Sequence, residues 1–193
     1  PKQRAASLAY VPQRSTVSFG FTVEQIIRMG RFALPNHPPA ITDAISRCDL
    51  GALVDRPFVE LSVGQQQRVL LARAIAQSMG GGKAVLLDEP VSAMDLAHIH
   101  RVMTTLVDMA RDGLACVVVL HDLNLASLYA DTVWLMDEGR MVKAGDWDEV
   151  LRPEVLEPVY GVRIDQVRRP TDPGDPASRR PVFDVRLPDG FSD

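Results

Sequence analysis

Three short apolar runs predict buried strands. Residues 5–11, 84–87 and 117–120 are mostly apolar, and each run is followed within two residues by polar side chains. Runs of this kind, without regular polar alternation, are typical of strands buried on both faces of a parallel sheet. In open α/β sheets, ligands bind just beyond the carboxyl ends of the strands. The polar residues expected to meet at this edge and form a ligand site are Gln13, Asp88, Glu89 and His121.

The region between the first two runs has the periodicity of helices. A helix with Thr22 as its N-cap is predicted first. The segment that begins at Ser62 predicts the strongest helix of the chain, with one apolar face and an opposite face that carries Gln and Arg. The predicted helical segments are residues 22–31, 41–48, 50–54 and 62–79, and a proline-rich break covers residues 34–39. The pattern therefore indicates a helical insert that interrupts an α/β core.

Further elements are predicted beyond the second apolar run. Asp95 is a suitable N-cap for a helix over residues 96–111, which ends at Gly113. The elements that follow are a short helix at 124–130, a β-hairpin over 133–143, a loop rich in Pro, Arg and Asp at 168–181, and a late edge strand at 182–187. The chain thus divides into four predicted parts: the end of the first part of an α/β core (1–14), a helical subdomain (15–80), the second part of the core (81–145) and a C-terminal extension (146–193).

Composition narrows the possible functions. The 193 residues are 46% hydrophobic and 24% charged, as in ordinary globular proteins. The net charge of -4 and the scattered Lys and Arg residues argue against a dedicated nucleic-acid binder. No apolar run approaches the roughly 20 residues that span a bilayer, so a membrane role would need a partner. Cys48 and Cys116 are expected to be reduced, structural thiols. The start at Pro1 instead of Met predicts a fragment.

Residues 61–68, with the sequence LSVGQQQR, contain a candidate anion site. Ser62 and Gln65 have the spacing of a capping box at the start of a long helix. Gly64 allows close approach of the backbone to a ligand. The amide groups and the positive end of the helix dipole then favour a bound anion. An ordinary capped helix would explain the capping box alone, but the Gln-rich turn and the strand after the helix favour the functional interpretation.

Residues 84–90, with the sequence AVLLDEP, end a predicted strand with two adjacent acids. The carboxylate of Asp88 at the strand tip can hold Mg²⁺, while the metal bridges the β and γ phosphates of a nucleotide. Glu89, one residue later, is placed to orient and deprotonate an attacking water. Adjacent acids also occur in simple turns, but the four apolar residues before them and Pro90 after them favour the catalytic interpretation.

These two motifs resemble the signature sequence and the Walker B motif of ABC-type ATPases. Residues 92–95 (SAMD) look like the D-loop, which in that family contacts the opposite subunit, and Gln13 matches the Q-loop glutamine, which reaches Mg²⁺. His121 matches the switch histidine, whose imidazole would hydrogen-bond the γ-phosphate and the catalytic water. The resemblance implies an α/β fold of the P-loop NTPase (RecA-like) type, a parallel-sheet core with an inserted helical subdomain, and ATP and Mg²⁺ as ligands. The residues it implies are Gln13, Ser62, Gly64, Gln65 and Asp95 for ATP, Asp88 and Gln13 for the metal, and Glu89 and His121 for catalysis.

The resemblance also implies a P-loop, GxxxxGK[ST], upstream of Gln13, and the 193 residues contain none. Residues 80–83 (GGGK) do not replace it. The position of its first Gly is Gln77, Ala84 stands where Ser or Thr must bind Mg²⁺, and the segment precedes a strand instead of opening a helix. We therefore expect the isolated 193 residues neither to bind ATP tightly nor to turn it over.

Two positions depart from the family pattern. Val63 stands where the signature has a glycine, and its β-branched side chain is expected to crowd the phosphate. Val91 stands where Thr usually follows Glu-Pro, which is a milder change. Because Glu89 and His121 are both present, hydrolysis by the full-length protein is still expected.

Several stretches are similar to one subfamily, the cassettes of importers for iron chelates, haem and cobalamin: residues 21–31, 95–98, 120–126, 149–151 and 159–162. This resemblance implies a homodimer of cassettes docked to a membrane permease at the cytoplasmic face of the membrane, with a separate substrate-binding protein that delivers cargo. The stretch from Asp95 to His98 resembles the haem members of this subfamily more than the others. The helical insert, from Thr16 to about Met79, would receive the permease near Phe19, Phe21 and Arg31.

Two other functions share these motifs. One is a non-transport ABC ATPase that acts on nucleic acid or ribosomes, which the acidic balance and the lack of basic linkers disfavour. The other is a catalytically silent regulatory cassette, which only Val63 and the missing P-loop suggest. The cargo cannot be read from the sequence, because a cassette does not touch it.

Overall fold

The computed structural model describes residues 6–13, 20–167 and 180–186, and the chain forms two compact units, Pro1–Val119 and Leu120–Asp193. Some sequence-based expectations fall outside the described residues: the start of the helical insert at Thr16, the docking role of Phe19, and most of the loop at 168–181.

The first unit contains a parallel three-stranded sheet with the order β1-β2-β3. Its strands are β1 (Leu8–Val11), β2 (Ala84–Asp88) and β3 (Ala115–Val119), so the predicted parallel strands are confirmed. Burial on both faces is wrong for β1, because Ala9 and Val11 are buried whereas Leu8 and Tyr10 are about half exposed. It is also wrong for β3, none of whose residues is fully buried. Successive side chains of a strand point to opposite faces, and the described residues cover only one face of β1.

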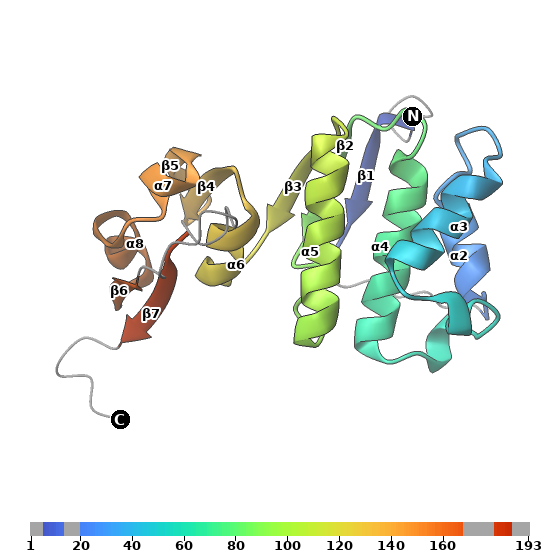
Figure 1. The fold of residues 1–193 in the computed structure, drawn as a ribbon, viewed down its shortest axis with the longest axis horizontal. Coiled ribbons are helices and arrows are strands. Elements are labelled where there is room, and N and C mark those ends of the chain that lie inside the picture. Colours follow the sequence, from blue (N-terminus) through green and yellow to red (C-terminus); the bar gives the residue numbers. More distant parts are fainter. Residues whose placement is uncertain (1–5, 14–19, 168–179, 187–193) are drawn as a thin grey trace, which may run out of the picture. The chain divides into compact units, whose positions relative to one another are not determined.

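A helical layer is built around the longest helix of the region (Figure 1). This helix is α4 (Val63–Ser78), and both α2 (Val23–Met29) and α3 (Pro38–Arg47) pack against it. Two short 3-10 helices, η1 (Gly51–Leu53) and η2 (Phe58–Glu60), lie between α3 and α4 in the chain. The predicted polar face of α4 is narrower than expected: Gln66, Arg73 and Gln77 are half-buried on one side, and buried residues cover the rest of the helix. The buried residues are Arg68, Val69, Leu70, Leu71, Ala72, Ala74, Ile75, Ala76 and Ser78.

The helix boundaries follow from local capping. Thr22 caps α2 with a capping box, as its position in the sequence predicts. The proline-rich break is in part the beginning of α3, because Pro38 and Pro39 occupy its first positions, where the missing amide hydrogen costs nothing. The helix α5 (Leu96–Arg111) begins after its predicted N-cap, Asp95, and packs on β3.

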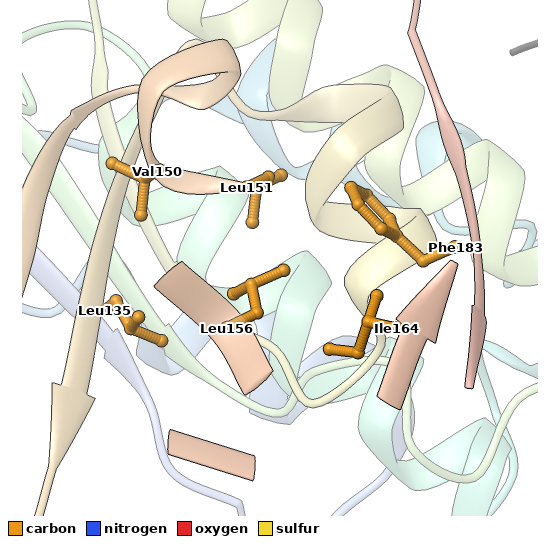
Figure 2. Close-up of a cluster of buried hydrophobic side chains, with 6 residues drawn as sticks. All are labelled: Leu135, Val150, Leu151, Leu156, Ile164 and Phe183. Carbon is orange, nitrogen blue, oxygen red and sulfur yellow. The ribbon is translucent and has the colours of Figure 1, made fainter. Parts of the chain in front are cut away.

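The second unit is smaller and mixes short helices with two hairpins. Its elements are α6 (Leu123–Tyr129), β4 (Thr132–Asp137), β5 (Arg140–Asp146), α7 (Trp147–Val150), α8 (Pro153–Tyr160), β6 (Arg163–Val167) and β7 (Val182–Arg186). The predicted hairpin is confirmed as β4–β5, and the late strand is confirmed as β7. Its partner β6 escaped prediction. Figure 2 shows the core of this unit: Leu135, Val150, Leu151, Leu156, Ile164 and Phe183.

Within the described parts of the chain, no helix is long and apolar enough to cross a membrane. Both cysteines are free thiols; Cys48 is buried and Cys116 is half-buried. The first unit therefore carries both thiols, and the sequence places both tryptophans, Trp134 and Trp147, in the second.

Candidate functional site

The N-terminus of α4 is shaped by a reciprocal capping box. The Ser62 hydroxyl accepts a hydrogen bond from the backbone N–H of Gln65 at 3.3 Å, and the Gln65 side-chain oxygen accepts one from the backbone N–H of Ser62 at 3.0 Å. Ser62 is exposed, and Val63 beside it is 65% exposed. The positive end of a 16-residue helix thus opens to solvent, which is a suitable place for an anion such as a phosphate.

The next two glutamines fix this turn to the rest of the first unit. The Gln66 side chain donates to the carbonyl oxygens of Phe58 and Leu61, at 3.1 and 3.2 Å. The Gln67 side chain donates to the Ser92 hydroxyl and accepts from the Ala93 N–H, both at 3.3 Å. The start of α4 is therefore joined directly to the loop after β2.

Gly64 is explained by a contact within the chain. A Cβ atom added at Gly64 would lie 2.5 Å from the carbonyl oxygen of Ala93, a separation that real Cβ atoms do not reach. Glycine at this position lets the first turn of α4 lie against residues 92–95. Close approach of the Gly64 backbone to a ligand, the reason expected from the sequence, stays a prediction beside this internal contact.

The acids at the end of β2 lie in a tight turn. Asp88 and Glu89 are half-buried, and Glu89 has a φ of 46°, a left-handed conformation that is uncommon for residues other than glycine. The Glu89 N–H donates to the carbonyl oxygen of Val119 at 3.2 Å, and the Glu89 carbonyl accepts from the Ser92 hydroxyl at 3.3 Å. A strained residue held by its surroundings is typical of functional sites, at a cost of about 1–3 kcal/mol.

Gln13 and Asp88 follow neighbouring strands at the same edge of the sheet. Val11 is in register with Leu87, so both side chains come just after paired positions of β1 and β2. Amide and carboxylate oxygens are the ligands that Mg²⁺ prefers, and the metal usually takes one or two of them together with phosphate oxygens and waters. No cluster of three or more acidic, His or Cys residues occurs in the described ranges. Asp88 and Gln13 supply oxygen ligands of the kind that Mg²⁺ takes, and their role as its ligands stays a prediction.

Asp95 is held by the residue three positions after it. One carboxylate oxygen accepts from the His98 N–H at 3.0 Å, and the other lies 2.7 Å from Nδ1 of the His98 ring. The hydrogen bond from the His98 backbone, and then that from its side chain, hold the pKa of Asp95 below its usual range. Sequence reasoning left His98 without a role, although the spacing Asp-x-x-His after an N-cap is a usable signal.

His121 belongs to the second unit, where it is exposed. It lines a cavity of about 290 Å³ together with Asp122, Asn124, Tyr160 and Phe183, among other residues of that unit. Asp122 caps α6 by accepting from the N–H groups of Asn124 and Leu125, at 2.7 and 3.1 Å. The predicted role of His121 at the edge that carries Asp88 and Glu89 stays a prediction.

Comparison with known proteins decides the family. A model of the ABC transporter family matches residues 1–92. The chain is 41% identical over 175 residues to the hemin import ATP-binding protein HmuV of Pseudomonas aeruginosa, and the match covers 86% of this chain and 68% of that protein. The chain belongs to the ABC transporter family of ATP-binding proteins. The predicted family assignment is thereby confirmed.

Other members of the ABC family support this result. The hemin import ATP-binding protein HmuV of Rhodococcus jostii is 41% identical over 174 residues, and the match covers 87% of this chain but 59% of that protein. A solved structure described as a metal-chelate type ABC transporter in an inward-facing conformation superposes with a TM-score of 0.77 at 30% identity, covering 93% of this chain and 73% of the other. The α/β fold expected from the motifs is thus confirmed, and the chain spans about 60 to 70% of the length of these two relatives.

The structure corrects one residue of the predicted docking surface. Arg31 is buried, and its guanidinium donates to the carbonyl oxygens of Ala76 and Met79 at 2.7 and 2.8 Å, and to that of Pro35. These carbonyls include the last ones of α4, which have no partner within the helix. Arg31 therefore holds the C-terminus of α4 and cannot offer its charge to a permease.

Proposed function

We propose that this chain is part of the ATP-hydrolysing subunit of an ABC importer, which couples ATP hydrolysis at a dimer of cassettes to the uptake of haem or a similar metal chelate. The observation that carries the proposal is the direct joining of the signature turn to the catalytic strand end. Gln67 of α4 bonds to Ser92 and Ala93, which follow Glu89 at the end of β2. The phosphate-binding turn and the water-activating acid therefore belong to one connected assembly.

In this proposal, residues of the first unit have separate roles in ATP hydrolysis. Asp88 and Gln13 would hold Mg²⁺, which neutralises charge on the phosphates. Glu89 would orient the attacking water and take its proton. The exposed turn at Ser62 would contact the γ-phosphate of the nucleotide held by the partner cassette, with Gln65 and Gly64 shaping that turn.

Val63 has a definite place in this proposal. Its side chain is 65% exposed at the first position of α4, so it causes no crowding within its own chain. It would face the nucleotide in place of the usual glycine and restrict the space around the γ-phosphate. These 193 residues contain no P-loop sequence.

The proposed partners follow from the relatives. The two similar proteins above are named as hemin import ATP-binding proteins, and the similar solved structure is a metal-chelate type transporter. We assign to this chain a permease in the membrane, a second cassette and, indirectly, a substrate-binding protein, with the cassette at the cytoplasmic face. Haem and ferric siderophores are the first cargoes to test, haem because the relatives carry that name, and cobalamin comes next.

The test is transport by the full-length protein with its permease in lipid vesicles, in the presence of the binding protein. We expect haem to accumulate in the direction of import only when ATP and Mg²⁺ are supplied on the cassette side. Glu89→Gln keeps the side-chain size but removes the base, and should lower kcat by about 10²–10⁴-fold. Hydrolysis and uptake are measured on the same vesicles.

Glu60→Gln is the matched control. Glu60 is an exposed acid of the same unit, and its carboxylate lies 3.8 Å from the Arg56 guanidinium. This variant should hydrolyse ATP and take up haem at the wild-type rate. Full ATPase activity in Glu89→Gln would refute the assignment of the base, and ATP hydrolysis without uptake of haem, ferric siderophore or cobalamin would refute the importer assignment.

A further inference from the structure

The imidazole of His98 lies between two carboxylates from distant parts of the first unit. Its Nδ1 is 2.7 Å from Asp95, the last residue of the predicted D-loop, and its Nε2 is 3.6 Å from Asp49. Asp49 follows α3, in the predicted helical subdomain, and is separated from His98 by the whole of α4 and β2. The His98 side chain is 27% exposed, whereas the Asp49 and Asp95 side chains are 58% and 66% exposed, so the ring is partly shielded and both carboxylates face solvent.

Asp49 itself is firmly positioned. Its φ is 53°, in the left-handed region, and its carbonyl oxygen accepts from the Arg68 guanidinium at 2.7 Å. Arg68 lies on α4, is almost completely buried, and also donates to the carbonyl oxygen of Cys48 at 2.9 Å. The Asp49 carboxylate is 3.4 Å from Arg101 and 3.7 Å from Arg68. One side of the His98 ring thus faces a carboxylate that α4 and α5 both hold in place.

The other side of the ring acts on the D-loop. Asp95 is the N-cap of α5, and both of its oxygens are engaged by His98, one through the backbone and one through the ring. An N-cap residue fixes where the helix begins and the direction from which the chain enters it. A displacement of Asp49 would therefore reach residues 92–95 through a single side chain.

We propose that His98 is a positioning residue that ties the Asp95 cap of the D-loop to Asp49 of the helical subdomain, so that movement of the subdomain is transmitted to the cassette interface. The proposal rests on the proposed function, because the D-loop and the subdomain have these roles only in an ATP-driven transporter. The Nδ1 contact with Asp95 is a hydrogen bond, and the 3.6 Å contact between Nε2 and Asp49 is a longer, electrostatic one. The charged groups around the ring are Asp95 and Asp49, and Arg101 and Arg68 also lie close to the Asp49 carboxylate.

The kinetic test is a double-mutant cycle in the full-length transporter, with His98→Ala, Asp49→Asn and the double variant. Asparagine tolerates the left-handed conformation and leaves the Asp49 carbonyl in place for Arg68. We expect each single change to lower kcat for ATP by about fivefold or more, within the usual range of coupling between sites, and to change KM by less than about twofold. The kcat of the double variant should be no lower than the lower of the two single-variant kcat values, because both changes remove the same bridge.

His100→Ala is the matched control on the same helix. His100 is exposed and two positions from His98, so it lies on a different face of α5. Its kcat and its ratio of uptake to hydrolysis should equal those of the wild type. Additive effects of His98→Ala and Asp49→Asn, or an Asp49→Asn variant with wild-type kcat, would overturn the proposal.

Hydrogen exchange separates this proposal from the proposed function. The amide of His98 donates to Asp95, so its protection reports the state of the cap. We expect faster exchange at the start of α5 in Asp49→Asn, although residue 49 is remote in the sequence, and no change in His100→Ala. A wild-type protein that hydrolyses no ATP would refute the proposed function, whereas unchanged exchange in Asp49→Asn would refute the bridge whatever the activity.

Discussion

The two units of the chain close the C-termini of their helices in the same way but use the N-termini differently. In the first unit, the Arg31 guanidinium donates to carbonyls at the end of α4. In the second, the Arg180 guanidinium donates to the carbonyls of Ser127 and Ala130 at the end of α6, at 2.7 and 2.5 Å, and lies over the ring of Trp147. Each arginine is about 50 residues away in the sequence from the carbonyls it binds. The last carbonyl oxygens of a helix have no hydrogen-bond partner within it, and the arginines supply one.

The N-termini show where the difference lies. Asp122 at the start of α6 caps only its own helix. At the start of α4 the cap is followed by Gln66 and Gln67, which reach two other segments. Side chains that end a helix stabilise the unit, whereas side chains that connect the beginning of one helix to a neighbouring loop can also pass on movement. The predicted functional residues of the first unit lie at helix N-termini and strand ends.

The largest expected effect is on the stability of the second unit alone. Leu156 is completely buried in the cluster of Figure 2, so Leu156→Ala should lower the free energy of unfolding by about 2–5 kcal/mol. Both tryptophans of the chain lie in this unit, and their fluorescence during urea denaturation reports it selectively. We expect the fluorescence transition to move to lower urea.

The control is Leu96→Ala in the first unit, where Leu96 is 84% exposed and the change should stay within about 0.5 kcal/mol. Far-UV circular dichroism, to which the long helices α4 and α5 contribute strongly, should retain a transition near the wild-type position in Leu156→Ala. If both signals shifted together, the two units would unfold as one and the comparison drawn above would fail.

Sequence reasoning succeeded where the information is local. The capping boxes at Thr22 and Ser62 are complete within four residues, and the N-cap Asp95 needs only the residues after it. The three parallel strands were recognised by their apolar runs, which depend on composition more than on neighbours. These features positioned Ser62, Gln65, Asp88 and Glu89 correctly at the ends of α4 and β2.

The features that escaped prediction depend on partners that are distant in the sequence. Arg31 looked like a surface residue because its acceptors at Ala76 and Met79 lie more than 40 residues away. The reason for glycine at position 64 is a carbonyl of residue 93. The strand β6 has the mixed sequence RIDQV and is stabilised by pairing with β7. Contacts of this kind are set by tertiary structure, and the hydrophobic pattern of a single segment carries no information about its distant partners.

A smaller effect tests the arginine at the end of α4. Arg31→Met removes a charged donor and leaves buried carbonyls without it, so the free energy of unfolding should fall by about 1.5–3 kcal/mol. The matched control is Arg28→Met, whose exposed ion pair with Glu24 contributes less than about 1 kcal/mol. Circular dichroism should show the shift, and the tryptophan transition should stay in place. If Arg31→Met and Arg28→Met lowered the free energy of unfolding equally, Arg31 would not hold the end of α4, and the surface role predicted from the sequence would stand.

The smallest expected effect is a loss of stability of the first unit at alkaline pH, caused by its buried thiol. Burial raises the pKa of the Cys48 thiol from 9.0 to about 12, although Arg68 nearby partly opposes the shift. Below pH 9 the thiol is protonated in both the folded and the unfolded chain, so its contribution to stability is complete. As the pH rises above 9, the unfolded chain loses the proton and the folded one keeps it, so stability falls by up to about 1.4 kcal/mol per pH unit. Urea denaturation followed by circular dichroism at pH 8, 9 and 10 should show a steeper decline for the wild type than for Cys48→Ala, and equal slopes would show that the thiol ionises as freely in the folded unit as in the unfolded chain.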